Sequence, residues 1–214
     1  MITSASVNTF QSALDFFNFV PTNQLIQDAD LIKELSFIPG LKEILMIRQV
    51  HALEHATVWV LSEADTSQTA GTLKTQVDNE SLGGLSTEQG FYLYGQANIA
   101  SLQSAVQIAL QRLTAGEWDL AVHPRCGTNV SVGILLTAGL GVGIYFLLPR
   151  GLIEQLLGLG VAAITAAQLT PHLGILAQRY ITTAIPFNLV IEDITLTRDV
   201  WGRSAYFVQV RWVD

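Results

Sequence analysis

The chain has 214 residues, enough for one good-sized domain or two small ones, and a formal net charge of −7 at pH 7. This acidic balance argues against a nucleic-acid partner, which would require a basic face. Half of the residues are hydrophobic and only 14% are charged, whereas about a quarter of the residues are charged in a typical soluble domain. The composition therefore indicates contact with membrane lipid. The single cysteine, Cys126, excludes an internal disulfide framework and leaves a thiol available for reaction or metal binding.

The first 63 residues are predicted to form a mainly helical N-terminal part. Two amphipathic segments, 10–20 and 23–38, are separated by Pro21 and are expected to pack against the protein or lie on a membrane surface. The opening segment, MITSASVNTFQSALDFF, has no basic residue and no uninterrupted apolar run, so no signal peptide is expected.

A long helix is predicted over residues 41–61, because a Pro-Gly pair precedes this segment and a polar, small-residue stretch follows it. Ile44, Ile47 and Val58 share one side of this helix with two histidines of the segment HALEH. The pattern predicts that this side points inward.

Residues 64–129 are predicted to contain a loop and a small β-α-β unit. The stretch 64–89 is rich in Ser, Thr, Gly, Gln and Asp and is expected to be an exposed loop. Aromatic and β-branched residues over 91–99 predict a strand, and apolar residues at helical spacing predict a helix over 101–116. The segment EWDLAVHP, 117–124, is interpreted as the second strand.

Residues 130–172 are predicted to form a transmembrane helical hairpin. The run from Val130 to Leu148 contains no charged residue and would span about 28 Å as a helix, close to the ~30 Å hydrocarbon core of a bilayer. A break at 149–151 precedes a second apolar run from Leu152 to Thr170. The alternative is a buried hairpin in a soluble core, which the small size of the chain disfavours.

The basic residues predict the orientation of an integral membrane protein with two spans. The turn carries only Arg150, and the other ten Lys and Arg residues lie outside the hairpin, so both termini are expected in the cytoplasm. Residues 173–214 are predicted to form an interfacial segment followed by a β-hairpin. The segment is expected either to lie at the membrane interface or to return along the membrane surface, and alternation over 189–214 predicts the hairpin and its pairing with the strand at 91–99. The predicted fold class is therefore an α+β membrane protein.

The segment HALEH matches the pattern H-x-x-E-H, in which His51, Glu54 and His55 lie within about a 100° arc of a helix. Two imidazoles one turn apart can chelate one metal ion, and the glutamate can hold or deprotonate a water molecule there. This is the arrangement of the inverzincin motif. The alternative is a polar island held together by hydrogen bonds.

A second cluster, HPRCGTN, immediately precedes the first apolar run. His123 and Cys126 are three residues apart, a spacing that allows both to bind one ion around a turn, although a turn at a membrane boundary explains the Pro and Gly equally well. Together with His51 and His55 they complete a set of four metal ligands suited to zinc. His172, next to Pro171, is predicted to have a structural role and not to bind the metal, because nothing in the sequence places it near the other ligands.

The blocks HALEH, HPRCGTN and AQRYITTAIP occur in an order that resembles the YqhQ-type family of uncharacterised bacterial membrane proteins, and resembles still more a related group from photosynthetic bacteria. The resemblance covers about residues 51–186 in scattered blocks. It implies a predicted metal-dependent enzyme, with His51, His55, His123 and Cys126 as metal residues and Glu54 in the position of the base.

Three departures from that family bear on the resemblance. The YqhQ-type pattern has Lys where this chain has Ala56, and membrane segments precede its H-x-x-E-H helix. The stretch from Ala56 to Val122 is also longer than expected of that family. The resemblance implies no substrate.

Two functions from different classes follow. The first is a membrane-anchored, zinc-dependent hydrolase in which Glu54 activates water. The second is a non-catalytic assembly or scaffold protein with membrane protein partners, in which a metal or a hydrogen-bonded cluster docks the helix onto the hairpin. If Cys126 closes the coordination sphere, the site is structural, because a catalytic zinc usually keeps one position open. Ligation of heme or chlorophyll is a third reading, but two histidines on one helical turn suit a small ion better.

Overall fold

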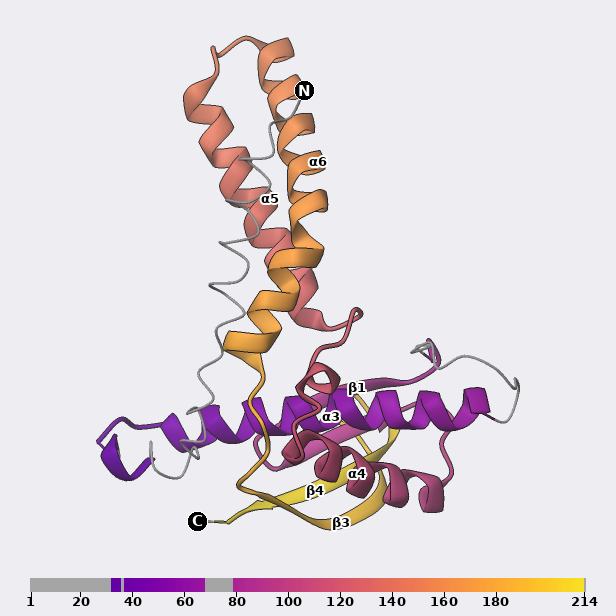
Figure 1. Cartoon of the computed structure of the whole chain (residues 1–214). Helices are drawn as coiled ribbons and strands as arrows, with labels where there is room; N and C mark the ends of the chain where they lie inside the picture. The colour runs from indigo at the N-terminus through magenta and orange to yellow at the C-terminus, as the bar shows by residue number, and fades with distance from the viewer. Residues whose placement is uncertain (1–31, 36, 68–78, 214) are drawn as a thin grey trace, which may run out of the picture.

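The computed structural model describes residues 32–35, 37–67 and 79–213. A pair of long helices rises from a base made of a four-stranded sheet and two helices (Figure 1). The amphipathic helices predicted for residues 10–20 and for most of 23–38 lie outside the described residues. The mixture of helices with an antiparallel sheet agrees with the predicted α+β class.

The sheet is antiparallel throughout and has the strand order β1-β2-β4-β3. Strand β1 spans Gly83–Thr87, β2 spans Gly90–Tyr94, β3 spans Leu189–Arg198 and β4 spans Ser204–Trp212. The predicted C-terminal hairpin, β3 with β4, is confirmed, and so is its pairing with the strand around FYLYG. Strand β1 falls in the segment predicted to be a loop, so that prediction is wrong for Gly83–Thr87.

Helix α3, Leu41–Ser67, crosses the base and provides much of its core. Residues Val50, Leu53 and Ala56 are fully buried on it. The long helix is confirmed and extends beyond its predicted end. The predicted inward face is only partly right, because Val58 is buried whereas Ile44 and Ile47 are largely exposed.

Helix α4, Ile99–Thr114, is confirmed with its apolar positions buried against α3. The Asn98 side chain accepts a hydrogen bond from the Ala100 N–H and caps the helix. The second strand of the predicted β-α-β unit is wrong, because that segment forms a 3₁₀ helix, η1, over Trp118–Ala121. The backbone–backbone hydrogen bonds of this segment are formed within residues 117–122, and Leu120 and Ala121 are buried in the core that includes α3. The segment therefore does not add a strand to the sheet.

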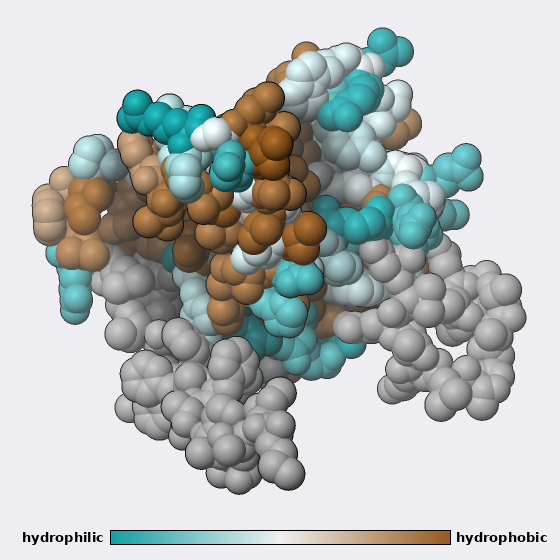
Figure 2. All heavy atoms as spheres, turned by 90° about the horizontal axis from the view of Figure 1, so that it is seen from above, coloured by the Kyte–Doolittle hydropathy of each residue, from teal (hydrophilic) through white to brown (hydrophobic). Residues whose placement is uncertain are grey.

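The hairpin consists of α5, Gly127–Leu147, and α6, Leu152–Ala177, which continues into a short π-helix, η2, at Gln178–Thr182. Both helices are long and apolar enough to cross a membrane, with mean hydropathy of 2.1 and 1.5 in their most apolar windows. Helix α6 passes through Pro171, so much of the segment expected at the interface is helical. Seen along the hairpin, apolar side chains gather over it and hydrophilic ones lie around it (Figure 2).

A buried amide joins the hairpin to the base. The Gln178 side chain, at the lower end of α6, accepts a hydrogen bond from the His123 N–H at 2.8 Å and donates one to Asn129 Oδ1 at 2.9 Å. Gly174 lies against Asn129, and any side chain there would overlap the asparagine. These contacts hold the end of α6 against the start of α5 and against the segment at His123 that leads into it.

Candidate metal centre

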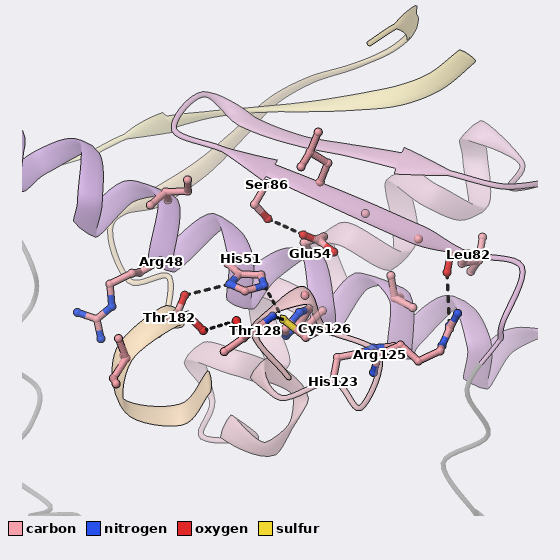
Figure 3. Close-up of a pocket in the computed structure, with 18 of the residues that line it drawn as sticks. Arg48, His51, Glu54, Leu82, Ser86, His123, Arg125, Cys126, Thr128 and Thr182 are labelled. Atoms are coloured by element: carbon pink, nitrogen blue, oxygen red, sulfur yellow. Dashed lines mark hydrogen bonds between the residues drawn. The ribbon is translucent and has the colours of Figure 1, made fainter. Parts of the chain in front are cut away.

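A cavity of about 600 Å³ lies where α3 passes the start of α5, the end of η2 and strand β1 (Figure 3). Four of the five residues singled out in the sequence are buried, and His51 is half-buried. All five line this cavity: His51, Glu54, His55, His123 and Cys126. The cavity therefore brings together the two clusters, HALEH and HPRCGTN, which are more than 60 residues apart in the chain.

The two histidines of α3 are each held by a backbone carbonyl. His51 Nδ1 lies 3.0 Å from the Thr182 oxygen, and His55 Nδ1 lies 2.7 Å from the Ala121 oxygen. A carbonyl can only accept a hydrogen bond, so Nδ1 of each ring carries the proton. In the neutral form of each ring the lone pair is then on Nε2, which is how a second contact commonly orients a metal-binding histidine.

Cys126 is the N-cap residue of α5, and its sulfur lies 3.2 Å from His51 Nε2. The Thr128 N–H donates a hydrogen bond to the same sulfur. Burial alone would raise the pKa of the Cys126 thiol, but the hydrogen bond and charge of His55 and the hydrogen bonds from Thr128 outweigh it and lower the pKa. A lowered pKa increases the fraction of the thiolate, which is the form that binds metal.

The ligand atoms of His51, His55 and Cys126 all lie within 4.8 Å of one another. Two imidazole nitrogens and one thiolate sulfur at this separation could hold a metal ion. Their geometry is set by four elements: α3, which carries both histidines, the cap of α5, and the backbone carbonyls of η1 and η2.

Glu54 lies beside this group on the side of the cavity formed by β1 (Figure 3). Its Oε2 accepts a hydrogen bond from the Ser86 hydroxyl at 2.5 Å. Burial raises the pKa of Glu54 above its ordinary value, although the Ser86 hydrogen bond and the charge of His51 act in the opposite direction. Glu54 thus faces the same cavity as the three ligand atoms without belonging to their group.

His123 packs against the group but is not part of it. Its ring lies 5.5 Å from that of His55 and 5.0 Å from that of Trp59, measured between centroids. His123 Nδ1 accepts a hydrogen bond from the Arg125 N–H, so in the neutral ring Nε2 carries the proton, the opposite tautomer to His51 and His55. Its role as a fourth ligand stays a prediction. His172 is exposed on α6, away from the lining of this cavity.

The residues that hold Glu54 and the two histidines of α3 in place were not predicted from the sequence. Ser86 and Gly84 belong to the strand hidden in a Ser- and Gly-rich segment, and a side chain at Gly84 would overlap the Glu54 carboxylate. Thr182 and Ala121 act through backbone carbonyls. A carbonyl contact leaves no residue-type signal, whereas a glycine pair entering a strand is a recognisable sign of close approach.

A family model described as a domain of unknown function, DUF6391, matches residues 46–194, a range that contains all five predicted site residues and the hairpin. The chain belongs to the DUF6391 family. It is also 52% identical over 192 residues to an uncharacterised protein of Picosynechococcus sp., covering 89% of this chain and 92% of the relative.

The cyanobacterial source of that relative is in keeping with the expected likeness to proteins of photosynthetic bacteria. Assignment to the YqhQ-type family itself stays a prediction. No solved structure matches the chain. Membership of the DUF6391 family names no reaction, so a function must be argued from the site.

Proposed function

We propose that the protein is a membrane-anchored, metal-dependent hydrolase, with zinc as the ion that best suits its donors. His51, His55 and Cys126 are the proposed ligands and Glu54 the proposed general base. The observation that carries the proposal is that the group within 4.8 Å contains three protein donors, and Glu54 lines the same cavity. Three protein ligands with one open position are typical of catalytic zinc sites.

The expected reaction is the addition of water to an acyl carbon. A divalent ion in this group would act as a Lewis acid toward the carbonyl and toward water. Glu54 accepts one proton from the attacking water and returns it to the leaving group, whose bond to the acyl carbon breaks as the new C–O bond forms. The Ser86 hydroxyl holds the Glu54 carboxylate in position for this transfer.

The hairpin is the proposed membrane anchor. In the most apolar windows of the two helices, 0% and 17% of the residues are buried inside the protein, whereas the core helix of a soluble protein would be mostly buried. The metal centre lies at the base of this hairpin, at Cys126 before α5 and Thr182 at the end of η2. The active site would accordingly open close to the membrane surface.

The substitution Glu54→Gln tests the proposal. The variant should bind metal as the wild type does, because Glu54 is outside the ligand group, and should hydrolyse about 10²–10⁴ times more slowly, the usual contribution of a general base. Metal-loaded protein in detergent would be assayed against a panel of fluorogenic esters and amides. Glu63→Gln, on the same helix, is the matched control, because Glu63 pairs with Arg112 away from the cavity.

Equal turnover by wild type and Glu54→Gln would contradict the proposal. Absence of turnover by metal-loaded wild type over the whole panel would also count against it and would favour a scaffold with a structural ion.

A further inference from the structure

The two edges of the sheet differ in how well they are protected from pairing with another strand. In the strand order, β1 and β3 each have a partner on one side only among the described strands. Strand β3 carries Glu192 and Asp193 at its middle, together with an irregular register between Ile191 and Asp193. Charges and bulges of this kind protect an edge from pairing with another chain.

Strand β1 has none of these protections. Its sequence, GGLST, has no charge and no proline, and its register with β2 runs without interruption. In an antiparallel pair, alternate residues direct their N–H and C=O groups to the partner strand and the others direct them outward. Gly83 has open space around it, which allows another backbone to approach closely, whereas the Glu54 carboxylate packs against Gly84.

The unprotected edge belongs to the strand that borders the metal centre. Gly83, Gly84, Leu85 and Ser86 line the cavity, and the labelled Ser86 holds Glu54 on its β1 side (Figure 3). The opposite edge, β3, contributes no lining residue to this cavity. Of the two edges formed by the described strands, the one without a charge or bulge is therefore next to the proposed catalytic groups.

We propose that β1 is a docking edge for an extended peptide, so that the substrate of the proposed hydrolase is a polypeptide. This inference rests on the proposed function. The peptide adds as a strand to Gly83–Ser86, through main-chain hydrogen bonds, as in recognition by β-strand addition. Its scissile amide then lies between Glu54 and the ligand group: the C–N bond breaks, water supplies the oxygen of the new carboxylate, and the amine leaves with one proton through Glu54.

The rim of the cavity indicates an apolar peptide. Three isoleucines line the rim and are exposed to water: Ile44 (56%), Ile47 (40%) and Ile181 (68%). Exposure of apolar surface to water is unfavourable, and an apolar side chain of a bound peptide would cover it. Ile181 lies in η2, which continues the apolar helix α6, so the rim is continuous with the proposed membrane anchor. A segment of a membrane protein that emerges at the bilayer surface meets both requirements.

The experiment measures binding and cleavage separately. The probes are fluorescent decapeptides with apolar residues at alternate positions, made with a native backbone and with alternate amides N-methylated. Binding is measured to the metal-loaded Glu54→Gln protein in detergent by fluorescence anisotropy. We expect at least about tenfold weaker binding of the N-methylated peptide, because it cannot complete the strand pairing. Equal binding of the two peptides, or no binding of either, would overturn the inference.

A photo-reactive group in the peptide then locates the bound strand. Cross-links should map to 83–87 and not to 189–198, the matched edge that lacks a catalytic neighbour; mapping to β3 would overturn the inference. Cleavage is measured with the wild type on a quenched version of the peptide and on a long-chain acyl ester. If the ester is hydrolysed and the peptide is not, the peptide is not the substrate, but the proposed hydrolase activity is supported. If the peptide binds and neither probe is cleaved, the docking edge is supported and the proposed hydrolase activity is contradicted.

Discussion

Gly84 and Glu54 are in direct contact across the interface between β1 and α3, and a side chain at Gly84 would occupy the place of Glu54 Oε1. The absence of a side chain at this one position therefore decides where the carboxylate lies. The neighbouring Gly83 has open space around it, since a Cβ there would meet nothing within 4 Å. The two glycines form a natural pair of test and control.

Gly84→Ala should displace the Glu54 carboxylate and lower activity by about 100-fold, the effect of a misplacement of roughly 1 Å in a reacting group. Metal content should not change, because the three ligand atoms do not contact Gly84. On a small fluorogenic ester, which does not engage the proposed docking edge, Gly83→Ala should alter activity by no more than about twofold, because a Cβ there meets nothing within 4 Å. Hydrolysis and metal content would be measured on both; equal losses in the two variants would show that the effect is not carried by Glu54.

Local patterns were sufficient to predict much of this structure. Helix α3, the hairpin of α5 and α6, and the β3–β4 hairpin each have a strong hydrophobic period or length. The H-x-x-E-H spacing likewise places His51 and His55 on one helical turn, where the structure has them beside Cys126.

The features that were predicted wrongly or missed have a common physical cause. In each of them, contacts with distant or neighbouring parts of the chain decide the structure, and the residue pattern of the segment does not reveal those contacts. Strand β1 has almost no alternation, and its pairing comes from β2. The segment Trp118–Ala121 alternates like a strand but is held as a 3₁₀ turn by burial of Leu120 and Ala121. The tautomer of His123 depends on the backbone N–H of Arg125, which spacing alone does not reveal.

A carboxylate far from the metal centre gives the sheet a pH-dependent stability. Burial of Asp199 opposes ionisation, but hydrogen bonds from the Arg203 backbone, the Tyr94 hydroxyl and the Arg203 guanidinium outweigh it and lower its pKa to about 2, from an ordinary 3.8. A depressed native pKa stabilises the fold above the ordinary value and loses that effect as the pH falls through the native value.

Asp199→Asn should therefore lower the thermal midpoint near neutral pH, and the gap from wild type should narrow between about pH 4 and pH 2. Thermal denaturation in detergent across this range checks the prediction. The titration of the other carboxylates affects both proteins alike and so drops out of the difference in thermal midpoint. A gap that stays constant with pH would mean that Asp199 does not carry the stabilising charge.

The proposed anchor predicts that the hairpin turn and the β3–β4 turn lie on opposite sides of the membrane. Arg150→Cys and Val200→Cys would each be made in a Cys126→Ser background, so that every protein has one thiol. A membrane-impermeant thiol reagent applied to sealed vesicles should label one of the two positions and reach the other only after lysis. Labelling of both from the same side would refute a spanning hairpin.

The metal content of the purified protein decides whether His51, His55 and Cys126 form a metal site. Mass spectrometry on detergent-purified wild type should find about one divalent ion per chain, zinc by the nature of the donors. His51→Ala, His55→Ala and Cys126→Ser should each lose it, whereas His123→Asn should keep it, because His123 lies outside the three-donor group. A wild type without metal would contradict the account, and loss of metal in His123→Asn would show a closed, four-ligand site.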